Sequence, residues 1–228
     1  MITIILPTRK RPANITRMVD TIVATVSDIH NVELLIYIDD DDEESIPALQ
    51  AAAERISVNA IQGNKMPGSQ MYNAIFKEAK GDIIMFSADD IVFKTPNWDL
   101  LVQKEFDAYE DKILLVYGND GYQNGRIATH GFIHRYWVEL LGYVLPPKLA
   151  SAYTDEWMTD LAIRVGRKCY RSDLITEHMH PAVGKAPMDD VYKNRIEVAG
   201  DIAAYYKNLE GDRIADAAKL QAFIDIFK

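Results

Sequence analysis

A short apolar run ends abruptly in two carboxylates in the stretch Gly81-Asp82-Ile83-Ile84-Met85-Phe86-Ser87-Ala88-Asp89-Asp90. Its apolar part, residues 83–86, is typical of a buried strand. Burying an unpaired carboxylate is costly, so Asp89 and Asp90 are expected in a polar cleft that holds solvent, a cation or a substrate. In a parallel sheet, ligands bind at the carboxyl ends of the strands. The stretch therefore predicts an enzyme that handles an anionic ligand through a divalent cation.

Apolar runs and amphipathic helical patterns alternate on both sides of this stretch. The expected strands are residues 2–6, 33–38, 57–61, 83–86 and 113–117, and the expected helices are residues 14–26, 45–56, 68–79 and 97–109. This alternation favours a single Rossmann-like α/β domain, with a mostly parallel central sheet and helices on both of its faces.

The second half of the chain is less regular, because glycines punctuate a loop and a hairpin between residues 118 and 131. A loop is also expected over residues 184–192. The other expected elements are helices at residues 135–142 and 155–166, strands at 168–170 and 174–178, and a C-terminal helix from Arg213. In that last helix one face is apolar, and core packing or a homodimer contact would explain it; its residues are Leu220, Phe223, Ile224 and Phe227.

Composition limits the classes of function. The chain has 228 residues, 48% of them hydrophobic, and a net charge of −9, which argues against a nucleic-acid partner. No apolar run approaches the roughly 18 residues of a membrane-spanning helix. Residues 2–6 are expected to be a first strand and not a signal peptide. The single cysteine, Cys169, is expected in the core without a disulfide, and a cytoplasmic location fits.

A basic loop follows the first strand in the segment Pro7-Thr8-Arg9-Lys10-Arg11-Pro12. Three cations and a hydroxyl at the carboxyl end of a strand suit a phosphate or a nucleotide, although a solvated loop is the alternative. An acidic run at residues 39–44 follows the second strand. It lacks the glycine of a calcium-binding EF-hand loop, and Glu43 and Glu44 suit a helix N-terminus. Asp39, at the tip of the strand, is expected to contact a nucleobase or a ribose.

Two further segments carry metal-binding or acid–base side chains. In a strand, His178 and His180 point the same way, and histidine with aspartate is a good mixed site for a divalent transition metal. The zinc alternative is weak, because no cysteine pair is present. Asp155 opens a helix beside Glu156, as an N-terminal cap or as a general base. Motifs for serine hydrolases, P-loops and dinucleotide-binding folds are absent from the sequence.

Taken in chain order, these segments resemble a glycosyltransferase of the family 2 type, which has the GT-A fold, over about residues 1–190. The matching pieces are Ile-Leu-Pro-Thr-Arg at residues 5–9, Asp39, Asn73 on the third helix, and Ser87-Ala88-Asp89-Asp90 in place of the Asp-x-Asp motif. Ser87 replaces the first acid of that motif, and its last acid falls on Asp89. The resemblance divides the chain into a GT-A domain at 1–195, whose nucleotide-sugar half is 1–117 and acceptor half 118–195, and a C-terminal helical extension at 196–228.

The resemblance also implies roles for individual residues. Asp155 would be the catalytic base, and Asp89 would hold Mn²⁺ or Mg²⁺ together with His178 or His180. The residues that would bind the nucleotide-diphosphate sugar are Pro7, Thr8, Arg9, Arg11, Asp39, Asn73, Asp89 and Lys185.

The implied reaction is an inverting, metal-dependent sugar transfer to an acceptor hydroxyl that the sequence does not identify. A UDP-sugar is the expected donor. The alternatives are a catalytically weak or inactive nucleotide-sugar-binding module of the same fold, for which Ser87 is the reason, and a nucleotidyltransferase. The latter would need a glycine-rich basic signature after the first strand, which Thr8 to Arg11 match poorly.

Overall fold

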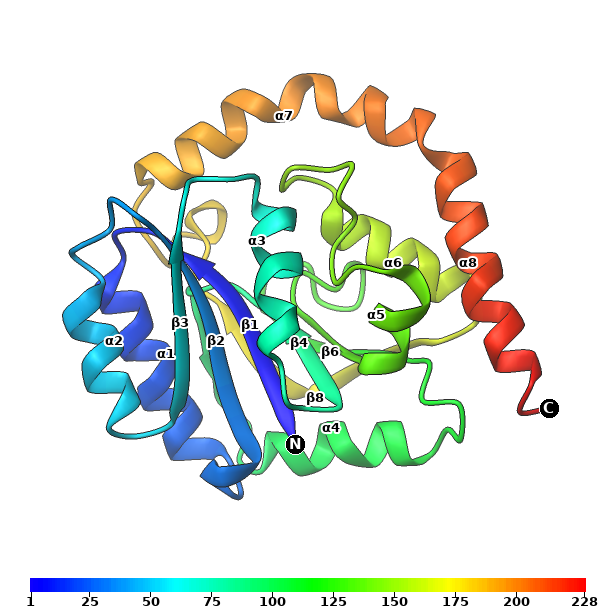
Figure 1. The fold of residues 1–228 in the computed structure, drawn as a ribbon, viewed down its shortest axis with the longest axis horizontal. Helices are drawn as coiled ribbons and strands as arrows, with labels where there is room; N and C mark the ends of the chain where they lie inside the picture. The colour runs from blue at the N-terminus through cyan, green and yellow to red at the C-terminus, as the bar shows by residue number, and fades with distance from the viewer.

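The strands form one sheet in the order β3-β2-β1-β4-β7-β6-β8-β5 in this computed structural model (Figure 1). The structure describes the backbone of residues 1–228 and every side chain except those of residue 191 and residues 194–201. The strands are β1 (Ile2–Thr8), β2 (Val32–Asp39), β3 (Ser57–Gly63), β4 (Ile83–Phe86), β5 (Ile91–Phe93), β6 (Leu115–Asn119), β7 (Gly131–His134) and β8 (Lys168–His178).

Parallel pairing dominates the first half of the sheet. Strand β1 lies between β2 and β4, and β3 lies beside β2, all in parallel. Further along, β6 and β8 are also parallel, whereas β4–β7, β6–β7 and β5–β8 are antiparallel. The predicted α/β fold with a mostly parallel sheet is confirmed, and its antiparallel pairs follow the irregular second half of the sequence.

Helices cover both faces of this sheet, as predicted. One face carries α1 (Pro12–Thr25), α2 (Ile46–Ala53) and α4 (Trp98–Asp107); the other carries α3 (Gly68–Ile75), α5 (Arg135–Leu141), α6 (Thr154–Arg164) and α8 (Glu210–Asp225). Neighbouring side chains of a strand point to opposite faces. Ile4 and Leu6 therefore belong to the core under α1, and Ile5 belongs to the core under α3.

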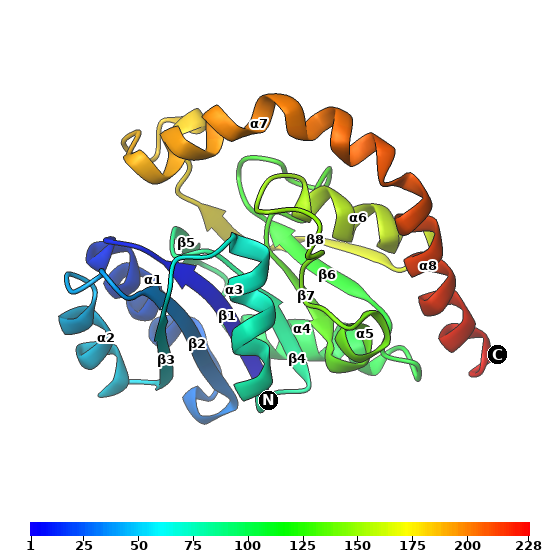
Figure 2. The same ribbon diagram turned by 45° about the horizontal axis from the view of Figure 1, so that its top comes forward.

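A long helix, α7 (Asp190–Asn208), runs above α3 and α6 and leads into α8 (Figures 1 and 2). The loop predicted to extend to residue 192 is wrong at its end, because the carboxylate of Asp189 accepts a hydrogen bond from the backbone of Tyr192 at 3.1 Å and caps the helix. The predicted boundary between residues 195 and 196 falls inside α7, where the side chains lie outside the described ones. The division of the chain stays a prediction.

The apolar face of the C-terminal helix packs on the body of the protein. Leu220 and Ile224 are buried in the same core as Trp157 of α6, and Phe223 is partly buried against it. Phe227 remains 40% exposed. The core role predicted for this face is confirmed, and the homodimer contact stays a prediction.

Two short strands, β5 and β7, were not predicted, and their pairing brings distant residues together. In the β5–β8 pair, Ile91 lies opposite His178, so Asp90 is next to the end of β8. Strand β7 runs antiparallel to β4, so His130, just before β7, lies at the carboxyl end of β4. The sheet thus gathers Asp90, His130 and His178 at one edge.

Cys169 lies half-buried at the rim of the core. Burial and the neighbouring charge of Glu105 raise the pKa of its thiol to about 12, so the thiol is unreactive at neutral pH. Within the described part of the chain, no helix is both long and apolar enough to span a membrane. The cytoplasmic location stays a prediction.

Candidate active site

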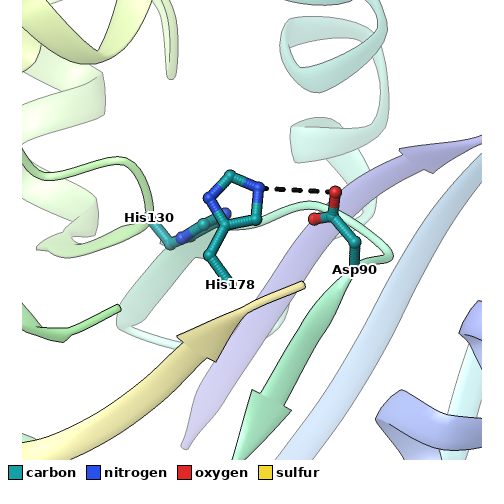
Figure 3. A group of neighbouring side chains, drawn as sticks. All are labelled: Asp90, His130 and His178. Atoms are coloured by element: carbon teal, nitrogen blue, oxygen red, sulfur yellow. Dashed lines mark ion pairs between the residues drawn. The ribbon is translucent and has the colours of Figure 1, made fainter. Parts of the chain in front are cut away.

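Three buried side chains form a group suited to a metal ion: Asp90, His130 and His178 (Figure 3). One potential ligand atom from each residue lies within 4.8 Å of the others. The Nε2 atom of His178 is 3.4 Å from Oδ2 of Asp90, and the rings of the two histidines meet edge to face at 4.7 Å. A carboxylate with two imidazoles is a donor set that divalent transition metals accept.

Two atoms of this group lack a hydrogen-bond partner among the described residues. They are Oδ1 of Asp90 and Nδ1 of His178, and both are buried. A buried polar atom without a partner is costly, and a cation would satisfy it. Burial raises the pKa of Asp90, but the hydrogen bond and charge of His178 outweigh it and hold that pKa below its ordinary value. The group therefore fits a divalent cation.

The sequence patterns gave His130 no role, and they favoured Asp89 over Asp90 as the metal ligand. A lone histidine between glycine-rich segments carries no motif of its own. The available signal was the apolar run Phe132-Ile133 that follows shortly after His130. An antiparallel strand over that run would place His130 at the edge near Asp90.

Asp89, predicted to be the main ligand, points to the basic loop instead. Its carboxylate accepts hydrogen bonds from Thr8 at 2.7 Å, Arg11 at 3.1 Å and Asn14 at 3.2 Å. Burial and the adjacent charge of Asp90 raise the pKa of Asp89. Asp89 thus anchors the loop after β1 to the loop after β4, and its role as a ligand stays a prediction.

His180 lies beside the group but beyond the end of β8. The expectation that His178 and His180 point the same way required both to lie in a strand, and only His178 does. Its ring stacks on Tyr122 at 4.7 Å and meets the ring of Tyr192 edge to face at 4.9 Å. Its Nδ1 accepts a hydrogen bond from the backbone of Ala182 at 3.0 Å. Here His180 packs against aromatic rings next to the site.

The three cationic side chains predicted to bind the donor, Arg9, Arg11 and Lys185, are all paired with acids. Arg9 bonds to Asp39 and, at 2.7 Å, to Asp41, and these bonds raise the pKa of its guanidinium. Lys185 pairs with Glu177 at 2.9 Å. Any phosphate must replace these carboxylates or join them. Asp39 is 2% exposed, and its Oδ1 has no partner among the described residues, so it offers a free acceptor at the tip of β2.

The first turn of α7 packs against Arg11 of the basic loop and against Asp90 of the metal group. Two nitrogens of Arg11 each donate to Asp189 at 2.8 Å, and the guanidinium lies 4.8 Å from the centre of the Tyr192 ring. The hydroxyl of Tyr192 donates to the carboxylate of Asp90. A cavity of about 220 Å³ opens beside them, and Asn14 and Asp90 help to line it.

Asn73, predicted to bind the nucleotide, contacts the chain itself. Its side-chain oxygen accepts from the backbone of Val144 at 2.8 Å and of Leu145 at 3.1 Å, and its nitrogen donates to the carbonyl of Leu145 at 2.8 Å. Both ends of the amide are therefore used to hold the segment that follows α5.

We expect Asn73→Ala to lower the free energy of unfolding by about 2 kcal/mol, because it leaves two backbone donors and one acceptor in a partly buried place. Denaturant unfolding would measure this, with the exposed Asn59→Ala in β3 as the control. Donor affinity should stay unchanged in the folded variant. A folded, stable Asn73→Ala that has lost donor binding would instead support the nucleotide contact implied by the sequence.

Asp155, the predicted base, lies in the first turn of α6 and is half-buried. The helix is fixed from below by Trp157 and Met158 in the core. It begins after Tyr153, whose φ of +66° is unusual for a bulky residue and whose ring stacks on Tyr206 of α7 at 5.0 Å. Strain of this kind is found at functional sites, where surrounding contacts maintain it.

Comparison with known protein families decides the class of this protein. The profile of Glycosyl transferase family 2 matches residues 3–162, more than half of the chain. The chain belongs to this family. The matched part includes β1, the acids after β2 and β4, and Asp155. The resemblance to family 2 glycosyltransferases found in the sequence is confirmed, and the protein is a glycosyltransferase. The comparison with curated protein sequences found no relative.

Solved structures of glycosyltransferases share the fold at low identity. A mannosyltransferase from Pyrobaculum calidifontis, solved with GDP-Man and Mn²⁺, has a TM-score of 0.69 and 15% identity over 99% of this chain and 73% of its own. S. aureus TarS in complex with UDP has 0.62 and 15%, over 77% of this chain and 59% of its own. Glucosyl-3-phosphoglycerate synthase from Mycobacterium tuberculosis, solved with Mn²⁺ and UDP, has 0.57 and 16%, over 84% and 74%. The predicted GT-A fold is confirmed.

Proposed function

We propose that this family 2 enzyme carries out a metal-dependent, inverting transfer of a sugar from a nucleotide-diphosphate sugar to an acceptor hydroxyl. The observation that carries the proposal is the buried group of Asp90, His130 and His178, with two polar atoms that lack partners among the described residues. The group lies at the edge where strands β1, β2 and β4 end, and ligands of such sheets bind there.

Donor binding is assigned to the loops at that edge. Asp39 would accept a hydrogen bond from the base or ribose through its free Oδ1. Thr8 and Arg9 would line the nucleotide, while Arg11 and Lys185 would exchange their carboxylate partners for the diphosphate. Such an exchange would replace one anionic partner by another and keep each side chain paired. A UDP-sugar is the proposed donor class; GDP-Man in the first solved relative makes a GDP-sugar the alternative to test.

Mn²⁺ or Mg²⁺ held by Asp90, His130 and His178 would supply charge for the leaving nucleoside diphosphate. Asp155 would take the proton of the acceptor hydroxyl as that oxygen forms a bond to the anomeric carbon. The bond from the anomeric carbon to the diphosphate oxygen breaks on the opposite face, so the configuration inverts. A donor set of two imidazoles and one carboxylate favours Mn²⁺ over Mg²⁺, which prefers oxygen ligands.

Thermal-shift measurements with UDP-, GDP-, dTDP- and CMP-sugars would test this function. At a donor concentration about 100 times the Kd, binding stabilises by about 2.7 kcal/mol, which corresponds to a rise in Tm of about 5–10 °C. We expect one nucleotide class to give this rise with Mn²⁺ and to lose it with EDTA. A rise that EDTA leaves unchanged contradicts metal dependence, and no rise with any of the four contradicts the donor class.

The inactive-module alternative rests on Ser87, which takes the place of an acid. Ser87 is buried, and its hydroxyl contacts the adjacent carbonyl of Ala88 at 3.3 Å. The group of Asp90, His130 and His178 does not include Ser87, so it offers a carboxylate and two imidazoles without an acid at this position. Slow donor hydrolysis that depends on Mn²⁺ would separate an enzyme from a binding module.

A further inference from the structure

Asp120 is a buried carboxylate in the loop after β6. Its Oδ1 accepts hydrogen bonds from the backbone of Tyr122, Gln123 and Asn124 at 2.8–2.9 Å, and its Oδ2 accepts the hydroxyl of Thr129 at 2.8 Å. In each of these four contacts the neighbouring group donates, so the carboxylate of Asp120 acts in all of them as an acceptor.

The proton of Thr129 is thereby assigned. A hydroxyl has one hydrogen to donate. A carboxylate can accept that hydrogen bond but has no hydrogen to donate back. The hydrogen of Thr129 points to Asp120, and its lone pairs face Nδ1 of His130 at 3.0 Å. Nδ1 must then carry the ring hydrogen, which leaves Nε2 of His130 as the nitrogen with a lone pair.

The same loop also contacts the second histidine of the metal group. The backbone carbonyl of Asp120 accepts a hydrogen bond from the backbone N–H of His178 at 2.8 Å. Asp120 thus contacts His178 directly through its main chain and is linked to His130 by way of Thr129.

We propose that Thr129 and Asp120 are positioning residues that fix His130 in the tautomer whose Nε2 carries the lone pair that would bind the cation. The inference rests on the metal site of the proposed function. Metal-bound imidazoles commonly donate their other N–H to an acceptor that sets the tautomer and the ring orientation, and loss of the acceptor costs about 10–100-fold in affinity. Here the acceptor is a hydroxyl that a buried carboxylate orients.

A purely structural role of Asp120 in its turn is the competing explanation. The three backbone hydrogen bonds to Oδ1 hold that turn without Thr129. Substituting Thr129 therefore tests the contact to His130 while it leaves the turn in place. Thr129→Val has nearly the same shape and no hydroxyl, and Thr129→Ser keeps the hydroxyl as the matched control.

Mn²⁺ titration followed by electron paramagnetic resonance, without donor, would give the affinities. We expect Thr129→Val to bind about 10–100-fold more weakly than wild type and Thr129→Ser to bind like wild type. In a His130→Ala background, Thr129→Val should change the affinity no further. Equal Mn²⁺ affinity of Thr129→Val and wild type would overturn the positioning role and leave the metal site intact. Absence of Mn²⁺ binding to wild type would instead overturn the proposed function.

Nitrogen-15 NMR of the five imidazoles in the metal-free protein would show the tautomer directly, above the pH range in which histidine titrates. We expect Nδ1 of His130 to carry the hydrogen in wild type and in Thr129→Ser, and a mixture of tautomers in Thr129→Val. The measurement on the wild-type protein requires no metal, and it does not depend on whether any variant folds. A hydrogen on Nε2 of wild-type His130 would refute the assignment.

Discussion

Asp90→Asn is expected to remove metal-dependent donor binding and to slow donor turnover by at least about 10³-fold, because a catalytic metal contributes several kcal/mol and each 1.36 kcal/mol is tenfold. Asparagine keeps the shape of Asp90 but has no charge, and Asp90 supplies the single carboxylate of the metal group with His130 and His178. Calorimetric titration of Mn²⁺ and of donor with Mn²⁺ would measure the first effect, and release of nucleoside diphosphate the second.

The adjacent acid is the matched control. Asp89→Asn should keep most of the Mn²⁺ affinity, because Asp89 bonds to Thr8, Arg11 and Asn14 and not to the histidines. It should lower the free energy of unfolding, since the half-buried guanidinium of Arg11 loses one of the negative charges that it pairs with. If Asp89→Asn loses Mn²⁺ and Asp90→Asn keeps it, the sequence prediction of Asp89 as the ligand is correct and the site built around Asp90 is wrong.

The ambiguity between these two acids shows what sequence alone could determine. The apolar runs of β1, β2 and β4 and the helices between them are strong local patterns, so the parallel half of the fold was predicted in the right order. Which of two consecutive acids faces the site depends on the turn after β4, and the hydrogen bonds of Asp89 to the loop after β1 decide it. Those bonds join residues 75 to 81 positions apart in sequence.

His130 was missed for a related reason. Its neighbours Thr129 and Gly131 gave no strand or helix signal, and β7 and β5 are too short to be found by periodicity. Only the pairing of β7 with β4, and of β5 with β8, brings His130, Asp90 and His178 to one place. The roles of Arg9 and Lys185 were likewise read from charge alone, which cannot show that both are paired with acids of their own chain.

Asp155→Asn is expected to lower turnover by about 10²–10⁴-fold while the affinity for Mn²⁺ and donor stays unchanged. The acceptor hydroxyl must lose its proton as it attacks, and an amide cannot take it. Asp155 is half-exposed on the first turn of α6, whereas the core side chains Trp157 and Met158 fix the helix, so the substitution should leave the fold intact. Asp155 is not a member of the metal group, so we expect separate effects on binding and on chemistry.

Donor hydrolysis can measure this without a known acceptor, since water takes the place of the acceptor hydroxyl and needs the same base. Glu156→Gln is the matched control, because Glu156 is the neighbouring acid on the same helical turn, and it should retain most of the rate. Turnover of Asp155→Asn near the wild-type rate would contradict the assignment, and loss of rate in Glu156→Gln alone would move the base by one residue. Parallel loss of donor affinity in Asp155→Asn would make Asp155 a binding residue, because a base that acts only in the transition state changes the rate and not the ground-state affinity.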